Sequence, residues 1–295
     1  MRRRTLLLSG CGLAAGAVGV RVTESRNEGG RATALVAGSL QTVAGEVDGA
    51  TAEAHGSLAA AELVRSGARD PDALALAAPG LVTDLAGWHA AFATNALTVV
   101  YDPESEYAPV VRDDWRAALA REAVSVGRTD PARDPLGYRT LLALELAGRE
   151  GAPAEAIRGN AEVFPETQLL RALEAGGLDA AFAYRNMAVA HDLPHLDLSP
   201  RFDLSDPALA DHYRSAAVTV GGETIRGEPI EYGAAYLTDR GRAFHRNLVG
   251  DAERLREYGF GVPDEFPVVR GRGGESTVSD AHLAEPPVEH GRDNR

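Results

Sequence analysis

Short apolar runs alternate with segments of helical periodicity along most of this chain, and this alternation constrains the fold more than any other feature. Several of these runs lead into segments with apolar residues at helical spacing. Such an order of strand and helix predicts an α/β architecture with largely parallel sheets. The predicted strands are 34–37, 73–77, 97–101, 123–126, 180–184 and 216–220, and the predicted helices are 38–47, 57–66, 136–148, 167–175, 185–191 and 238–249.

The first apolar run leads directly into a Gly-Ser turn. In TALVAGSLQTVAGEV, at 33–47, the apolar residues stop at Ala37 and a helical pattern begins after Gly38-Ser39. A structural interpretation suffices for one such turn, because Ser is a common N-cap and Gly permits a tight turn. A functional interpretation stays open beside it, because the same geometry aims N–H groups and a hydroxyl at one point and so suits an anion.

Three further strand-to-helix junctions carry polar groups at a helix start. Ligands of open α/β sheets bind at the carboxyl ends of the strands, so these junctions are where a site is expected. Each feature alone is common, since Asp-Pro is usually a turn and a first-turn Glu complements the helix dipole. The junctions are EAHGSLAAAELVRSG at 53–67, GRTDPARDPLGYRTLLALELAG at 127–148 and VFPETQLLRALEAGGLDAAFAY at 163–184. Downstream, Gly221-Gly222 predicts a hairpin turn.

Composition limits the classes of partner. The chain has 295 residues, of which 44% are hydrophobic, enough for one large domain or two of ordinary size. The net charge of −13 argues against nucleic acid as a partner. All 30 basic residues are Arg, and an acidic, lysine-free composition is typical of adaptation to high salt (halophilic proteins) or of a GC-rich genome. In molar salt, where the Debye length is about 3 Å, the acidic surface repels a small anion only weakly.

The two ends of the chain differ from its body. Residues 1–20, MRRRTLLLSGCGLAAGAVGV, have a basic start and a short apolar run, which predicts an export signal and resembles the twin-arginine type. Cys11, the only cysteine, excludes a disulfide within one chain. It ends LSGC, which resembles a lipobox, so it is either a lipidated residue or a thiol discarded with the signal. Residues 21–31 are predicted to be a linker, and 271–295 a disordered tail.

The order and spacing of the junctions resemble the archaeal-type molybdate/tungstate-binding proteins, the solute receptors of ABC importers. The resemblance covers about residues 33–260. Its most specific parts are an Asp-Pro-x-Gly-Tyr-Arg element and a Phe-x-Tyr-Arg segment. The matching segments are AGSL at 37–40, HGSLAA at 55–60, DPLGYRTL at 134–141, PETQLL at 165–170, GLDAAFAYRNMAVAHDL at 177–193 and DHYRSAAVTVGGETIRGEPIEYG at 211–233.

The resemblance implies an α/β, class II periplasmic-binding-protein fold. Two α/β lobes, joined by two chain crossings, would hold the anion in the cleft between them. One lobe would comprise 32–105 plus 205–270, and the other 106–204. The resemblance further implies an exported receptor on the extracytoplasmic face of the cell membrane, without enzymatic activity or cofactor, which we expect to be a monomer. It would deliver molybdate or tungstate to an ABC permease driven by an ATPase subunit.

The same resemblance assigns roles to five residues. Ser39 and Ser57 would supply hydroxyl and N–H donors from one lobe, and Tyr184 a hydrogen bond from the other. Asp134 and Glu166 fall on the two carboxylate positions, where each side chain gives an oxygen to the metal centre of the oxyanion. The tetrahedral anion would thereby become six-coordinate.

Carboxylates beside an oxyanion need a physical reason, because like charges repel. Molybdenum or tungsten in its highest oxidation state is a hard Lewis acid that accepts two more oxygen ligands, for which carboxylate is a suitable donor. Sulfate has no comparable acceptor at its centre. Paired carboxylates are therefore expected to disfavour sulfate and phosphate.

The chain departs from the family pattern in several places. Val36 stands where a His often precedes the Gly-Ser turn, and Ala77-Ala78-Pro79 where a strand often ends in Asp. The segment 160–165 is short where some members carry a long hairpin. The assignment of Glu166 rests on PET…LL and LEAGGLD, with Glu162 as the alternative.

Other functions were weighed against this one. A receptor for sulfate or phosphate is the nearest alternative, and an enzyme or sensor on the same fold is a further one.

Several local motifs do not indicate a site of another kind. Pro194 separates His191 from His195, which argues against a pair of metal ligands on one helix face. His55 and Ser57 are two residues apart and do not face each other on a helix, which argues against a nucleophile–base pair. GCGLAAG at 10–16 imitates a dinucleotide loop but follows no strand. Tyr232 stands near the proposed return strand and could be a binding residue, but it is interpreted as a core or hinge residue. The choice between molybdate and tungstate stays open.

Overall fold

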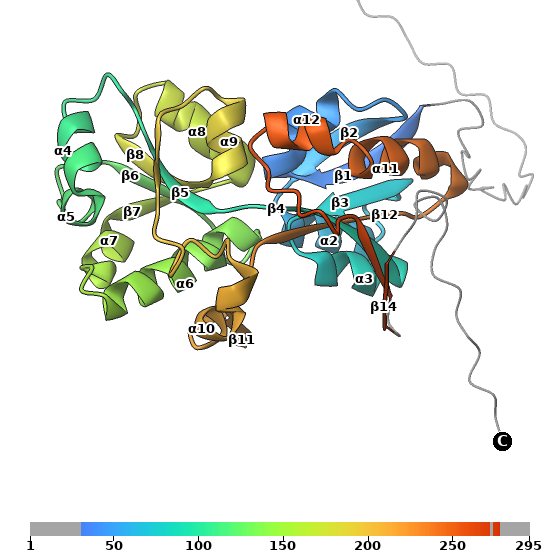
Figure 1. The fold of residues 1–295 in the computed structure, drawn as a ribbon. Helices are drawn as coiled ribbons and strands as arrows, with labels where there is room; N and C mark the ends of the chain where they lie inside the picture. The colour runs from blue at the N-terminus through green and yellow to red at the C-terminus, as the bar shows by residue number, and fades with distance from the viewer. Residues whose placement is uncertain (1–30, 272–273, 278–295) are drawn as a thin grey trace, which may run out of the picture. The chain divides into compact units, whose positions relative to one another are not determined.

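The computed structural model describes residues 31–271 and 274–277, which form two large mixed sheets with helices on their faces and one two-stranded hairpin (Figure 1). The seven-stranded sheet has the order β14-β13-β4-β12-β3-β1-β2, and the five-stranded sheet the order β7-β6-β8-β5-β9. The first sheet contains β1 (Ala32–Ala37), β2 (Ala50–His55), β3 (Ala73–Leu76), β4 (Trp88–Thr94), β12 (Glu231–Tyr236), β13 (Val268–Gly271) and β14 (Gly274–Thr277). The second contains β5 (Leu97–Tyr101), β6 (Val126–Thr129), β7 (Ala161–Phe164), β8 (Ala180–Tyr184) and β9 (His195–Asp197).

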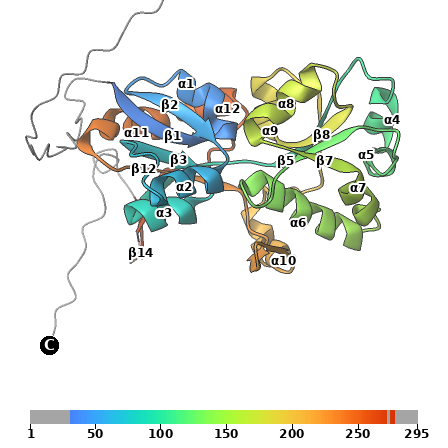
Figure 2. The ribbon, with the colours of Figure 1, turned by 180° about the vertical axis from the view of Figure 1, so that it is seen from behind.

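Helices cover both faces of each sheet (Figures 1 and 2). Over the seven-stranded sheet lie α1 (Gln41–Gly45), α11 (Arg242–Val249) and α12 (Ala252–Glu257) on one side and α2 (Ser57–Arg65) and α3 (Pro79–Ala86) on the other. Over the five-stranded sheet lie α8 (Glu166–Glu174) and α9 (Arg185–Ala190) on one side and α6 (Pro135–Arg149) and α7 (Ala154–Asn160) on the other. The remaining helices are α4 (Ala108–Asp113), α5 (Trp115–Leu119), α10 (Ala210–Arg214) and the short 3₁₀ turns η1 (Gly38–Leu40), η2 (Pro207–Leu209) and η3 (Asp239–Gly241).

The apolar strands form where the sequence predicts them. The predicted strands 97–101 and 180–184 coincide with β5 and β8, whose residues are all buried, as central strands require. The predicted turn at Gly221-Gly222 is confirmed: it joins β10 (Ala217–Val220) to β11 (Glu223–Arg226), and its φ angles of 60° and 88° favour Gly. The strand predicted at 123–126 is displaced, because β6 begins only at Val126 and runs through polar residues to Thr129.

The prediction of largely parallel sheets is wrong, because both sheets are mixed. β1, β2 and β3 are parallel to one another, but β12 pairs antiparallel with both β3 and β4. The register places Glu231, where β12 begins, opposite Thr94, where β4 ends. The chain thus re-enters the sheet at the end where it left, and the returning strand must run the opposite way.

The two sheets are joined at two crossings that lie side by side. Only Asn95-Ala96 separates β4 from β5, and the return passes through Ile230, whose carbonyl accepts a hydrogen bond from the Asn95 N–H over 3.2 Å. β5 therefore belongs to the five-stranded sheet, although 97–101 lies in the range proposed for the first lobe. In the returning segment, the N–H of Ala217 donates to the Glu145 carboxylate of α6 over 3.1 Å.

The predicted export signal at 1–20, its Cys11 and most of the linker lie outside the described residues. Of the predicted tail, 274–277 form β14, which pairs with β13, so this part is a strand. Within the described part of the chain, no helix has the length and apolarity needed to cross a membrane.

Candidate functional site

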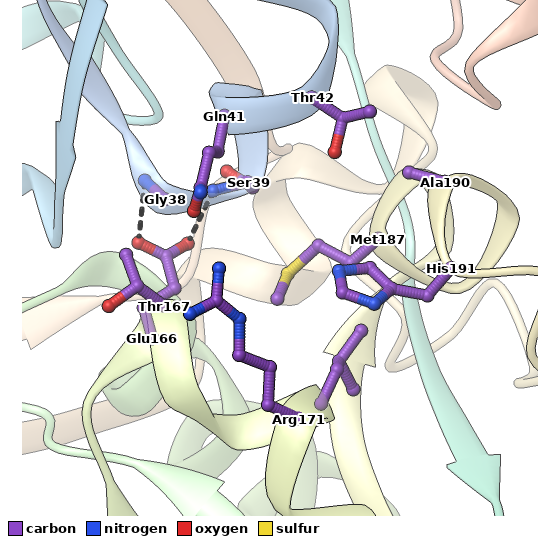
Figure 3. A pocket seen from close by; sticks show the side chains of 11 residues that line it. Gly38, Ser39, Gln41, Thr42, Glu166, Thr167, Arg171, Met187, Ala190 and His191 are labelled. Carbon is purple, nitrogen blue, oxygen red and sulfur yellow. Dashed lines mark hydrogen bonds between the residues drawn. The ribbon is translucent and has the colours of Figure 1, made fainter. Parts of the chain in front are cut away.

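The Gly38-Ser39 turn binds a carboxylate from another part of the chain. β1 ends at Ala37, and the N–H groups of Gly38 and Ser39 donate to the two carboxylate oxygens of Glu166 over 3.0 and 3.2 Å (Figure 3). Glu166 is the first residue of α8 and only 4% of its surface is exposed. In this structure the turn therefore binds a carboxyl group, and that group belongs to the protein's own side chain.

Both Gly-Ser turns need Gly because a second segment approaches them closely. A Cβ on Gly38 would lie 2.7 Å from Oε2 of Glu166. A Cβ on Gly56 would lie 2.7 Å from both the Arg133 carbonyl oxygen and the Cβ of Asp134. Real Cβ atoms do not approach other atoms so closely, so Gly at each turn makes room for a segment that carries a carboxylate.

Asp134 caps the N-terminus of α6. Its Oδ1 accepts hydrogen bonds from the Gly137 N–H over 3.1 Å and from Thr129 Oγ1 over 2.8 Å. Burial raises the pKa of Asp134 to about 7, although these hydrogen bonds oppose the rise. Capping accounts for the position of this side chain, but burial leaves its charge in an unfavourable environment.

Glu166 and Asp134 act on one another as like charges. Burial, followed by the charge of Asp134, raises the pKa of Glu166 well above its ordinary value, against the lowering by the Gly38 and Ser39 N–H groups. Two buried carboxyl groups that repel each other favour a proton or an electron-pair acceptor between them. Glu162, the alternative to Glu166, is exposed on β7.

Ser57 and Tyr184 are buried and make different contacts. Ser57 is the first residue of α2, and its Oγ accepts the Ala77 N–H over 3.0 Å. Tyr184 ends β8, and its hydroxyl oxygen accepts from Nη1 of Arg139 over 2.8 Å. In each hydroxyl the oxygen is engaged as an acceptor, which leaves its hydrogen for an acceptor such as an oxyanion oxygen.

Sequence reasoning missed a polar network around Ser39. The hydroxyl of Tyr232, interpreted as core or hinge, donates to Ser39 Oγ over 3.0 Å and accepts from Asn95 Nδ2 over 3.1 Å. Asn95 Nδ2 also donates to Asn186 Oδ1 over 2.7 Å, and Asn186 donates to the Ser39 carbonyl over 2.6 Å. The available signal was an Asn placed between two apolar strands, where a polar side chain needs partners.

Arg139 was also missed, although it lies inside the DPLGYRTL segment. Its guanidinium is buried on α6, and Nη1 donates over 2.8 Å both to the Ala77 carbonyl and to the Tyr184 hydroxyl. Through Ala77 it is linked to Ser57, whose Oγ accepts the N–H of the same residue. A buried, permanently charged side chain thus contacts a predicted site residue.

A pocket of about 130 Å³ opens beside the contact between Glu166 and the first turn. Gln41 and Thr42 face it from α1, and Met187 and His191 lie across from them (Figure 3). Ser39 and Glu166 also line it, whereas Asp134, Ser57 and Tyr184 do not. All five predicted residues are buried, and two of them also line this pocket.

The histidines weighed as metal ligands have different neighbours. His191 Nδ1 lies 2.7 Å from a Glu174 carboxylate oxygen, and His195 Nδ1 lies 3.2 Å from the Leu193 carbonyl. Across residues 31–271 and 274–277, no three His, Cys, Asp or Glu side chains are grouped so that they could hold a metal ion.

Comparison with known proteins identifies relatives that match most of the described residues. Residues 46–261 match the family described as bacterial extracellular solute-binding protein. A Haloferax volcanii protein, provisionally named an ABC transporter molybdenum-binding protein, is 42% identical over 287 residues, covering 90% of this chain and 93% of its own length. The molybdate/tungstate-binding protein WtpA of Pyrococcus abyssi is 32% identical over 223 residues, covering 63% of this chain and 65% of its own.

A solved structure shows the same fold at low sequence identity. The periplasmic molybdate-binding protein of Azotobacter vinelandii superposes with a TM-score of 0.57 at 12% identity, covering 79% of this chain and 100% of its own. The α/β periplasmic-binding-protein architecture that the resemblance implied is thereby confirmed.

Proposed function

The chain belongs to the family of bacterial extracellular solute-binding proteins, and from that premise we propose that it captures molybdate or tungstate and delivers it to an ABC permease. Two relatives, at 42% and 32% identity, carry names that state molybdenum or molybdate/tungstate binding. Members of this family bind solutes rather than transform them, so the prediction that the chain is not an enzyme is confirmed. The export signal, an anchor at Cys11, the ATPase subunit and the monomeric state stay predictions.

One observation carries the proposal: the Glu166 carboxyl group accepts hydrogen bonds from the N–H groups of Gly38 and Ser39, while Asp134 lies against the second Gly-Ser turn, 2.7 Å from where a Cβ on Gly56 would stand. The N–H groups of the first turn already bind a carboxyl oxygen, so an oxyanion oxygen suits the same position. When the oxyanion binds, its oxygens take these donors, and Glu166 turns its carboxylate toward the metal centre. Asp134 supplies the second carboxylate oxygen.

The neutral donors complete the proposed site. Ser39, Ser57 and Tyr184 would direct their hydroxyl hydrogens at the anion while their oxygens keep the present donors. Such donors alone accept any tetrahedral oxyanion of suitable size. The carboxylates give the discrimination, because they repel sulfate and phosphate but coordinate molybdenum or tungsten.

Titration calorimetry on the purified protein in high salt tests this proposal. We expect tight binding of molybdate or tungstate and no binding of sulfate or phosphate. Glu166→Gln and Asp134→Asn remove one coordinating carboxylate each, and we expect each to weaken tungstate binding by about a hundredfold, or two steps of 1.4 kcal/mol. Glu162→Gln, which neutralises an exposed carboxylate four residues before Glu166, is the matched control and should bind as wild type does.

Two results would contradict the proposal. Sulfate binding equal to or tighter than tungstate binding would make the chain a receptor for another oxyanion. Tungstate binding that is indifferent to both Glu166→Gln and Asp134→Asn would remove the carboxylates from the site and leave only a general solute receptor.

A further inference from the structure

Arg139 stands apart from the other basic residues of this chain. Among the arginines that the structure describes, it alone has a buried side chain. It lies on α6, in the segment that begins with Asp134. Burying a guanidinium is costly unless its charge is paired or hydrogen-bonded, so the groups around Arg139 indicate why its burial is tolerated.

We propose that Arg139 is the positioning and charge-compensating residue of the anion site, an inference that rests on the proposed function. It holds the Tyr184 phenol in place for the ligand. Its charge also offsets part of the negative charge that two carboxylates and a divalent oxyanion bring together.

The positioning role follows from the hydrogen bonds of a single nitrogen. Nη1 donates to the Ala77 carbonyl just past β3 and to the Tyr184 hydroxyl at the end of β8, so it links the two sheets. Because Arg139 donates into the phenol oxygen, the phenol hydrogen must point elsewhere, and an oxyanion oxygen can accept it. The N–H of Ala77 donates to Ser57 Oγ, so the same contact also supports the second serine.

The charge role follows from what surrounds the guanidinium. Tyr138 and Tyr184 lie beside it, with their ring centroids 5.8 and 5.9 Å from its central carbon, and the Tyr232 phenol also acts on it. Arg139 also lines a pocket of about 150 Å³ together with Arg226 and Glu228. Among the described residues, no carboxylate forms an ion pair with the guanidinium within 4.0 Å, and its hydrogen bonds go to a carbonyl and a phenol.

The proposed ligand site brings several negative charges together, and Arg139 is hydrogen-bonded to Tyr184, one of its residues. Asp134 and Glu166 are both buried, and each gains a raised pKa because its ionised form is unfavourable there. A divalent anion adds two more negative charges. In a region from which water is largely excluded, one permanent positive charge nearby is worth more than at the surface.

The test compares Arg139→Gln, which removes the charge, with Arg139→Lys, which keeps it. Tungstate is titrated into the full chain in the same high salt that tests the proposed function, and thermal unfolding establishes that each variant is folded. We expect Arg139→Gln to weaken tungstate binding at least about tenfold and Arg139→Lys to restore a large part of the loss. Arg149→Gln is the matched control, because it removes the same charge from an exposed position on the same helix, and it should bind as wild type does.

A double-variant cycle with Tyr184→Phe tests the positioning role. If Arg139 acts through the phenol, Arg139→Gln costs less in the Tyr184→Phe background than in wild type, so the two losses do not add. If Arg139→Gln does not fold, Arg139→Lys replaces it in the same cycle with the same expectation. Additive losses overturn the positioning role, and equal binding by the Gln and Lys variants overturns the charge role.

The outcomes separate this inference from the proposed function. Wild-type protein that binds no tungstate overturns both. Wild-type protein that binds tungstate while Arg139→Gln binds equally well overturns the inference alone.

Discussion

The turns at 38–39 and 56–57 have the same Gly-Ser sequence and follow parallel neighbouring strands, yet they make different contacts. At the first turn, two backbone N–H groups bind the Glu166 carboxylate. At the second, the Ser57 hydroxyl accepts the Ala77 N–H, and the Ala59 N–H donates to the Arg133 carbonyl over 3.0 Å. The first turn binds a side-chain carboxyl group, whereas the second is fixed by neighbouring backbone.

The comparison shows that a dipeptide sets only the local geometry. At both turns an added Cβ would lie 2.7 Å from the approaching segment, which carries Glu166 at the first turn and Asp134 at the second. At the first turn the approaching group is the end of a flexible side chain, and at the second it is backbone and a Cβ. The first contact can therefore open for a ligand, and the second cannot do so without moving the chain.

The largest expected effect concerns the carboxyl groups behind the turns. The pKa of Asp134 is raised to about 7, so ionisation is unfavourable in the folded state. The free energy of unfolding should therefore fall as pH rises from about 4 to about 7, by a few kcal/mol at most, since one pKa unit is about 1.4 kcal/mol. Urea unfolding of the ligand-free protein at several pH values measures this slope, which Asp134→Asn should flatten and Glu162→Gln should preserve. An unchanged slope in Asp134→Asn would place the cause in other groups.

The second prediction separates the turns by substitution of their glycines. Gly56→Ala forces a Cβ against the backbone of Arg133, and we expect it to lower the free energy of unfolding by about 2 kcal/mol. Gly38→Ala displaces only the Glu166 side chain, so its loss of stability should be smaller, while tungstate binding falls strongly. Gly45→Ala is the control, because nothing lies within 4 Å of its added Cβ. Equal destabilisation at Gly38 and Gly56 would show that the turns do not differ as described.

The smallest effect distinguishes the two serines. Ser57→Ala leaves the buried Ala77 N–H without its acceptor, which should cost about 1–2 kcal/mol of stability. Ser39→Ala should cost less, because its N–H still binds Glu166 and the Tyr232 hydroxyl still accepts from Asn95. Urea unfolding of both variants measures the difference. A greater loss of stability for Ser39→Ala than for Ser57→Ala would contradict this difference between the two turns.

The sequence alone predicts the strands that consist of apolar residues, such as β5 and β8, because burial on both faces leaves a readable run. It does not reveal β2, whose residues ATAEAH include exposed and half-buried positions at the sheet edge. Nor does it reveal strand direction, which depends on where the chain re-enters a sheet. The directions of β12 and β5 follow from the crossings at 95–96 and 230. No local sequence pattern predicts where the chain crosses between the sheets.

The candidate site likewise contains features that the sequence identifies and features that only the structure reveals. Asp134 and Glu166 stand at helix starts, a position that sequence can identify, and the structure buries both there. That Glu166 reaches the first turn could not be predicted, because the contact joins residues more than a hundred positions apart. Arg139 could not be identified for another reason. An Arg within a helical sequence pattern is expected on the solvent-exposed face, and only the packing of the folded chain shows that its side chain is buried.

The place of β12 has a consequence for the order in which the molecule can fold. This strand lies between β3 and β4 in the middle of the seven-stranded sheet, although it is made some 140 residues after β4. The five-stranded sheet, by contrast, is built from one continuous stretch, 97–197. During synthesis that sheet can be complete while β3 and β4 still lack the strand between them. The Gly-Ser turns and the carboxylates therefore meet in their final arrangement only after the chain has passed Tyr236.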